Sequence, residues 1–331
     1  MSQTFKIRKG YDIKLVGEAS SNDLGQHSAS TYAVSPLDFP GITPKLAVKA
    51  GANVLAGDTL FFDKDRPEVK ICAPVSGEVA EIKRGAKRKI LAVLLLADSE
   101  ISYANYGAFD FSRGDRDAIA GHFSNTGVGA FITTRPYGVV ASMNERPRDI
   151  FVNGVQSGPL NGDLATQLAG KGEAVQAAIS ALTLMTTGKV FVSHDADAAT
   201  VDELQVEGAT HISFSGKHPK GLVGTQIAKA APINKGELVW TVNAIDLPII
   251  GRAFLTGEYA PEYKVAITGS KAMNTGYATM LQGTSLNRFI SANINAENTR
   301  IIAGDVLTGT QQAMDGFLSF GKAQLTAIPE G

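Results

Sequence analysis

Short apolar runs, broken at close intervals by glycine or proline, dominate the first hundred residues. Apolar residues do not recur there at the spacing of a helix. Runs of this kind occupy residues 45–49, 54–62, 69–74 and 75–82. Short strands with glycine at the bends predict a small barrel or sandwich. The longest apolar run, residues 90–97, fits a buried strand and is too short to cross a bilayer.

From about Asp110 the pattern changes, because apolar residues now recur at helical spacing between short apolar runs. Helices are expected at residues 112–124, 164–184 (ending before Gly188) and, as a single turn, 201–206. Strands are expected at residues 149–155, 189–193 and 210–214. Strands that alternate with helices are typical of an α/β layer on a largely parallel sheet.

A third pattern begins after residue 260. Strands are expected at residues 263–268, 279–281 and 300–303, with a capped helix at 285–290 after Gly283 and Thr284. This order in so short a span predicts a β-grasp module. The best boundaries lie near residues 99–107 and 258–262, which divides the chain into domains 1–100, 101–258 and 259–331.

Charge and composition exclude several classes of protein. The net charge is -1, so neither a basic nucleic-acid-binding face nor a polybasic membrane anchor is expected. The N-terminus carries charges but no following apolar stretch, so no signal peptide is expected. Pro248 and Arg252 interrupt the apolar segment 245–255. No membrane span is expected, and any membrane contact should go through partner proteins.

Cysteine and histidine usage argues against a metal or cluster site. Cys72 is the only cysteine, so the chain alone can hold neither a four-thiolate iron–sulfur cluster nor an internal disulfide, which fits a reducing cytoplasm. The five histidines form no i, i+4 pair and no ligand-spaced pair with a carboxylate. A P-loop, a complete Gly-x-Gly-x-x-Gly fingerprint and a catalytic triad are also absent. We therefore expect no catalytic residues and no metal in this chain.

Several segments, taken in order, resemble one family: the A subunits of the Na⁺-translocating NADH:quinone oxidoreductases. The segments are 62–64, 69–70 and 73–79, then 84–88, 134–137, 214–225 and 298–310. The resemblance extends over essentially the whole chain. No single segment is specific, but their order and spacing are.

The resemblance implies a fold and a place in a complex. The family is related to the electron-transport C subunit of the Rnf complex and to the NADH-binding subunit of complex I. These relatives join a lipoyl-like barrel-sandwich hybrid, a Rossmann-like α/β domain and a β-grasp soluble-ligand-binding domain, in the order of the three patterns above. A further C-terminal region follows in the family, so we expect this chain to be truncated after the β-grasp domain.

The resemblance also implies a function. The complex passes electrons from NADH to ubiquinone or menaquinone and exports Na⁺. This subunit would be cofactor-free and peripheral, on the cytoplasmic face of the bacterial inner membrane, with a role in assembly and at the quinone site. Its partners would be the other members of a complex of six subunits, including the membrane-embedded B subunit. FAD, FMN, riboflavin and an iron–sulfur centre would belong to those other subunits.

Two cofactor sites remain as alternatives. Lys64 lies where lipoyl and biotinyl barrels carry their modified lysine, but residues 66–68 lengthen the loop, so an unmodified lysine is expected. Gly127 and Gly129 stand where flavin- and NADH-binding relatives have a longer glycine-rich run that lets backbone amides approach a phosphate. Residues 132–134 would crowd a phosphate here, so we interpret this as a relic nucleotide loop. A soluble flavin- or nucleotide-binding oxidoreductase is the alternative function.

Two further segments are candidates for contact with quinone or partner subunits. In the first, a guanidinium beside an aromatic ring could hold a quinone carbonyl and stack on its ring. It comprises Phe131, Thr134, Arg135, Pro136 and Tyr137. The second follows an apolar strand, and it contains Lys217, His218, Pro219 and Gly221. Because ligands settle at the carboxyl ends of parallel strands, we expect both segments to lie together at one end of the α/β sheet.

Overall fold

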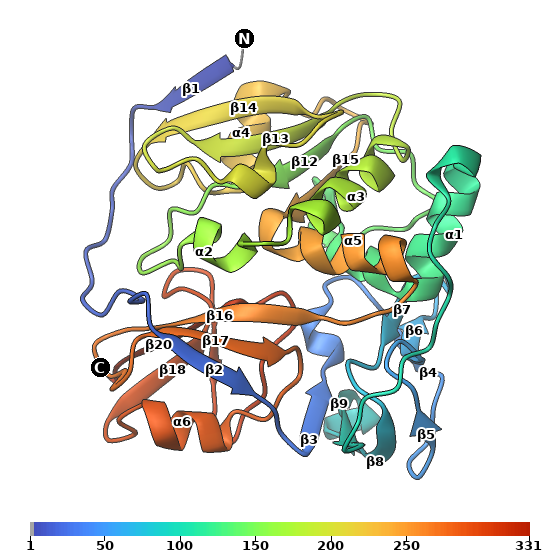
Figure 1. The fold of residues 1–331 in the computed structure, drawn as a ribbon, viewed down its shortest axis with the longest axis vertical. Coiled ribbons are helices and arrows are strands. Elements are labelled where there is room, and N and C mark those ends of the chain that lie inside the picture. Colours follow the sequence, from blue (N-terminus) through green and yellow to red (C-terminus); the bar gives the residue numbers. More distant parts are fainter. Residues whose placement is uncertain (1–2) are drawn as a thin grey trace.

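The computed structural model describes residues 3–331 and places its four sheets in three groups (Figure 1). A seven-stranded sheet with helices on both faces lies next to a six-stranded sheet, and α3 and α5 lie between the two. A four-stranded and a three-stranded sheet form the remaining group. The expected order of a barrel or sandwich, an α/β layer and a β-grasp module is therefore found.

The barrel-like group is made of short antiparallel strands, as the glycine-punctuated runs predict. Its four-stranded sheet contains β3 (Thr31–Val34), β9 (Ile90–Ala97), β8 (Gly77–Arg84) and β5 (Asn53–Val54). Its three-stranded sheet contains β4 (Pro44–Leu46), β6 (Thr59–Asp63) and β7 (Lys70–Cys72). Alternate residues such as Val79, Val93 and Leu95 are fully buried between the two sheets.

The seven-stranded sheet has the order β1-β14-β13-β12-β15-β10-β11. Five strands are parallel: β1 (Gln3–Ile7), β14 (Thr210–Gly216), β13 (Val190–Asp195), β12 (Ile150–Asn153) and β15 (Val239–Asn243). The edge strands β10 (Thr133–Arg135) and β11 (Val139–Val140) are antiparallel. The chain proceeds from β12 to β13 and β14 on one side and then returns to β15 on the other side of β12.

Helices cover both faces of this sheet. One face carries α1 (Arg116–Thr126), α2 (Leu164–Leu168), α3 (Gly172–Thr183) and α5 (Leu247–Thr256), and the other carries α4 (Val223–Ala230). The predicted single helix at 164–184 is wrong, because Gly170 adopts a φ of 75° and separates α2 from α3. Within residues 3–331, no helix is both long enough and apolar enough to cross a bilayer.

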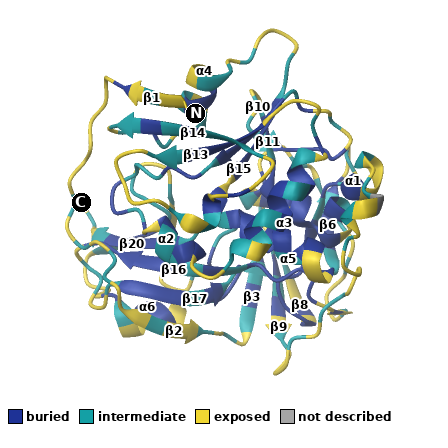
Figure 2. Ribbon diagram, turned by 45° about the horizontal axis from the view of Figure 1, so that its top comes forward, coloured by how far each residue is buried: buried dark blue, intermediate teal, exposed yellow. Residues whose placement is uncertain are grey.

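The six-stranded sheet has the order β19-β18-β20-β16-β17-β2. Its strands are β2 (Asp23–His27), β16 (Glu262–Thr268), β17 (Gly276–Leu281), β18 (Thr299–Ala303), β19 (Thr310–Gln312) and β20 (Gln324–Pro329), accompanied by α6 (Asn287–Asn293). Tyr263 and Leu325 from this sheet share one buried cluster with Leu182 and Phe254 of the α/β layer. Figure 2 shows this shared buried zone between the two sheets.

The N-terminal strands pair differently from the predicted division at residue 100. The strand β1 adds to the edge of the α/β sheet beside β14, and β2 adds to the edge of the β-grasp sheet beside β17. The segment between them runs along the outside of the molecule and links the two sheets (Figure 1). Both pairings are parallel and distant in sequence, so a local pattern cannot reveal them. Residues 1–2 lie outside the described residues.

Other elements also differ from the sequence pattern. The pattern missed β15 and α5, and it also missed the short strand at residues 133–135. Residues 201–206 contain only a 3-10 turn, Asp202–Leu204. The helix expected at 285–290 begins at Asn287 without a side-chain cap, because the hydroxyl of Thr284 donates to Leu281 O instead.

Candidate functional site

The main candidate site is a groove at the carboxyl ends of β12 and β15. These neighbouring strands end at Asn153 and Asn243, which are paired in register. The connection that leaves β12 passes over the α3 face, whereas the connection that enters β15 passes over the α4 face. Such a switch point leaves a crevice beyond the strand ends, where open α/β sheets bind ligands.

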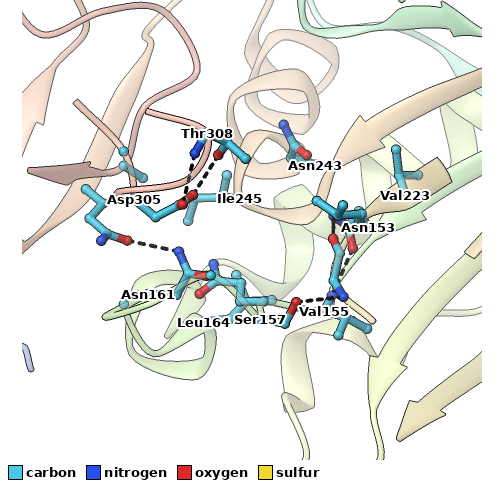
Figure 3. A pocket seen from close by; sticks show the side chains of 18 of the residues that line it. Asn153, Val155, Ser157, Asn161, Leu164, Val223, Asn243, Ile245, Asp305 and Thr308 are labelled. Carbon is cyan, nitrogen blue, oxygen red and sulfur yellow. Dashed lines mark hydrogen bonds between the residues drawn. The ribbon is translucent and has the colours of Figure 1, made fainter. Parts of the chain in front are cut away.

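The groove has a volume of about 710 Å³ and is lined by polar and apolar groups in similar measure. Figure 3 shows Asn153 and Asn243 on the strand ends, with Asp305 and Thr308 approaching from the β-grasp domain. Lys322 and Gln324 of the β-grasp domain also line it. The groove therefore lies between two domains, which is a common location for small-molecule sites.

A buried hydrogen-bond network fixes Asn153 at the floor of the groove. Its Nδ2 donates to Gly221 O at 2.9 Å, and its Oδ1 accepts from Gln226 Nε2 at 2.8 Å. Gln226 is fully buried in α4, and its Oε1 accepts from the hydroxyl of Ser193 at 3.0 Å. Because all these polar atoms are paired within the protein, the strand end is rigid before any ligand arrives.

His218 also lines the groove, and one nitrogen of its ring is hydrogen-bonded to a serine hydroxyl. Ser157 Oγ accepts from Gly221 N at 2.9 Å and lies 3.0 Å from His218 Nδ1. When the hydroxyl hydrogen donates to His218 Nδ1, the hydrogen of the neutral ring lies on Nε2. His218 can thus offer one N–H donor to a ligand.

Arg135 reaches the same groove from the antiparallel strand β10. It is paired with Val239, whose side chain is buried in the cluster on the α4 face. Its Nε is buried, and within residues 3–331 that atom has no hydrogen-bond partner. A buried guanidinium nitrogen without a partner is unfavourable unless a ligand or water accepts from it.

The expectation that both candidate segments lie at one end of the sheet is wrong. Arg135 lies opposite Val239 at the start of β15, whereas Lys217 to Gly221 follow the carboxyl end of β14. The reason is that β10 runs antiparallel to the other strands. Only the long side chain of Arg135 brings the first segment into contact with the groove.

The remaining predicted residues have other surroundings. Phe131 is buried and stacks on Phe320 at 4.4 Å, and Thr134 is buried in β10 beside Trp240. Pro136 and Pro219 each follow a cis peptide bond. Tyr137 is 75% exposed, and the ammonium of Lys217 lies 5.9 Å from the centre of the exposed Tyr11 ring. The structure therefore brings together Arg135, His218 and Gly221 at the groove.

Gly127, the first of the two loop glycines, has a packing role in this structure. Gly127 has a φ of 76° at the end of α1, and a Cβ there would lie 2.5 Å from Cys72 Sγ. A Cβ on Gly129 would contact Met143 at 3.4 Å. Burial raises the pKa of the Cys72 thiol to about 12. The contact with Cys72 joins the α/β layer to the barrel and accounts for Gly127 without a nucleotide, whereas the contact at Gly129 is an ordinary van der Waals one.

The sequence pattern missed a buried acid behind the groove. Asp246 Oδ1 accepts from the hydroxyl of Tyr263 at 2.7 Å, and Oδ2 accepts from Asn243 Nδ2 at 3.4 Å. Burial raises the pKa of Asp246 to about 7, and the bonds from Tyr263 and Asn243 oppose the rise. A repeated Val-Asn at the ends of β12 and β15 was the available signal for this site.

A second cavity, of about 730 Å³, lies on the other side of the loop that follows β12. It contains His194 and His211, whose Nε2 and Nδ1 atoms are 2.8 Å apart. Burial, together with His211, lowers the pKa of His194 to about 4. Across residues 3–331, no three His, Cys, Asp or Glu side chains gather closely enough to hold a metal ion.

Comparison with known proteins adds the family context. Three domain profiles match in order. They are the NqrA N-terminal barrel-sandwich hybrid domain at residues 5–98, the NqrA second alpha/beta domain at 114–259 and the NQRA C-terminal domain, of SLBB type, at 264–313. These matches confirm the predicted fold class: a barrel-sandwich hybrid, a Rossmann-like α/β domain and a C-terminal soluble-ligand-binding β-grasp domain.

Relatives of similar sequence extend over nearly the whole chain. The A subunit of the Na(+)-translocating NADH-quinone reductase of Marinomonas sp. (strain MWYL1) is 31% identical over 333 residues, covering 99% of this chain and 74% of that protein. The A subunit of the Alcanivorax borkumensis enzyme is 32% identical over 332 residues, covering 98% and 73%. A crystal structure of an air-oxidized NAD+-reducing NiFe hydrogenase is 11% identical with a TM-score of 0.44, covering 69% of this chain and 52% of that one.

Proposed function

Because the chain belongs to the family of A subunits of the Na⁺-translocating NADH-quinone reductases, we propose that its groove is where quinone meets this protein. The complex would pass electrons from NADH to ubiquinone or menaquinone and export Na⁺. This subunit would serve assembly and the quinone site, without a catalytic centre of its own. The observation that carries the proposal is the convergence of Arg135 and His218 on one groove at the switch point.

The groove offers what a quinone head group needs. A quinone has two carbonyl oxygens on opposite sides of a flat ring and carries no charge, so it requires hydrogen-bond donors rather than a phosphate cradle. The guanidinium of Arg135 and the ring of His218 both line the groove, and their N–H groups can act as such donors. Leu164, Val223 and Ile245 supply apolar surface for the ring.

The cofactors and partners follow from the same proposal. This chain would hold no redox cofactor, whereas FAD, FMN, riboflavin and an iron–sulfur centre would lie in other subunits. The buried thiol of Cys72, which its raised pKa keeps protonated, is unsuited to ligate iron. The protein would bind the membrane-embedded B subunit and its neighbours from the cytoplasmic face of the bacterial inner membrane.

One observation favours a second candidate, a nucleotide- or flavin-binding oxidoreductase. The first turn of α4 lines the groove without a side-chain cap. Thr225 N donates to Leu222 O at 2.9 Å, which leaves the N–H groups of Val223 and Gly224 for solvent or an anion. Lys322 adds a cation. Calorimetric titration of the chain with NADH or flavin mononucleotide separates the two candidates, because micromolar binding of either would favour the second.

Kinetics of the intact complex test the quinone proposal. In Arg135→Ala and His218→Ala, loss of one donor is expected to raise the KM for quinone about tenfold, with assembly preserved. Tyr137→Ala is the matched control, since this ring is exposed and lies outside the groove. Unchanged quinone kinetics in both groove variants would contradict the proposal.

A further inference from the structure

The near-zero net charge conceals one dense cluster of cations. Lys83, Arg84, Lys87, Arg88 and Lys89 fall within seven residues, and all five side chains are exposed. Within residues 3–331 none of them forms an ion pair with a carboxylate. We call these five residues the basic turn. Their mutual repulsion is uncompensated inside the chain, which favours an anionic partner.

The basic turn is held on a rigid support. It connects β8 to β9, two strands of eight residues that pair along their length. Gly85 N donates to Lys89 O at 2.9 Å, Lys89 N donates to Ala86 O at 3.2 Å, and Arg84 Nη1 donates to Arg88 O at 3.0 Å. The backbone that carries the cations is thus fixed, and it is not a flexible tail.

The backbone of the turn is strained at two of the cations. Lys87 and Arg88 have φ values of 54° and 61°, in the left-handed region that favours glycine. Glycine at either position would relieve the strain, yet both carry long charged side chains. Strain that surrounding structure maintains is a recognised mark of functional sites. The strained backbone is therefore a second observation, separate from the clustering of charge, that points to a function for the basic turn.

We propose that the basic turn docks on a membrane surface rich in anionic phospholipid headgroups. Clusters of four to eight lysines and arginines are suited to such surfaces, and each contributes about fivefold to binding. The turn has no large apolar side chain that could anchor a protein interface, which makes an acidic protein surface the weaker fit. Figure 1 places β8 and β9 at the end of the molecule away from β1.

Vesicle flotation of the full chain tests this proposal. The chain is expected to float with vesicles of phosphatidylcholine mixed with phosphatidylglycerol, to remain behind with phosphatidylcholine alone, and to dissociate when salt is raised. The double variant Lys87→Gly with Arg88→Gly should bind about 25-fold more weakly, since two cations are lost. Its melting temperature should be unchanged or higher, because the strain is relieved.

Two further variants make the result specific. Lys83→Gln with Lys89→Gln removes two cations of the turn outside its left-handed positions and should show the same loss of binding. Lys9→Gln with Lys14→Gln removes two exposed cations from the N-terminal segment and should bind as the parent does. The proposal is overturned if the parent ignores phosphatidylglycerol, as it would if the turn met only an acidic protein. It is also overturned if all three double variants weaken binding equally.

Discussion

Replacing Asp246 by asparagine should change how the stability of this chain depends on pH. The carboxyl group is completely buried at the start of α5, where it accepts a hydrogen bond from the hydroxyl of Tyr263 in the β-grasp domain. Burial raises its pKa from 3.8 to about 7, while Tyr263, Asn243 and the charge of Lys322 oppose that rise. The folded chain therefore keeps this proton well above the pH at which an exposed aspartate loses it.

The sign and the size of the effect follow from proton linkage. Between about pH 4 and pH 7 the folded chain keeps a proton that the unfolded chain has already released. The stabilisation that this proton gives the folded chain is fully present below the pKa of Asp246 in the unfolded chain. It is lost as the pH rises through the pKa of Asp246 in the folded chain. The free energy of unfolding should fall by about 1.4 kcal/mol per pH unit in this window, or about 4 kcal/mol in all.

Urea unfolding at several pH values measures this directly. Asp246→Asn has no proton to lose, so its stability relative to the parent should rise by about 3 kcal/mol between about pH 5 and pH 8. Asp117→Asn is the control, because its side chain is 88% exposed and it removes the same formal charge. A stability difference between parent and Asp246→Asn that stays constant with pH would refute the reasoning.

Three further outcomes are expected. Gly251→Ala should destabilise the fold by about 3 kcal/mol or more in urea unfolding, because its Cβ would lie 1.6 Å from a carbonyl oxygen of α3. Gly224→Ala is the control, because a Cβ at Gly224 would lie in open space. A similar loss of stability in Gly224→Ala would contradict the steric argument for Gly251. Lys220→Met should lower the free energy of unfolding by about 3 kcal/mol, because Lys220 is 8% exposed and bridges two aspartates at 2.6 and 3.0 Å. Lys220→Arg keeps the charge and should recover part of that stability. Cys72 should react with a thiol reagent only after unfolding, so prompt labelling of the native chain would be the contrary result.

Local patterns in the sequence were sufficient to predict the layers of the fold. Residues 189–193 and 210–214 are apolar runs bounded by turns, and they became β13 and β14. The helix break at Gly170 was less visible, because a glycine within a helical pattern reveals its left-handed φ only in the structure. The sequence could not predict which strands pair, because β1 could have joined any exposed sheet edge.

The groove was predictable only in part for a related reason. His218 and Gly221 follow a parallel strand, so the rule for strand ends located them. Arg135 was a candidate because of its chemistry. The sequence of the three-residue strand β10 does not show that this strand runs antiparallel to its neighbours. Asp305 and Lys322 come from a different domain, and their approach depends on how the two sheets pack. The groove is lined from six separate stretches of the chain, and residues so far apart leave no common spacing in the sequence.

The most direct test of the proposed quinone contact is photo-crosslinking in the intact complex. A photoreactive quinone analogue, followed by peptide mapping, should label this protein on peptides that contain Arg135 or His218. An excess of unmodified quinone should suppress that labelling. Labels found only on the membrane-embedded partners, or on this protein but remote from the groove, would contradict the proposal.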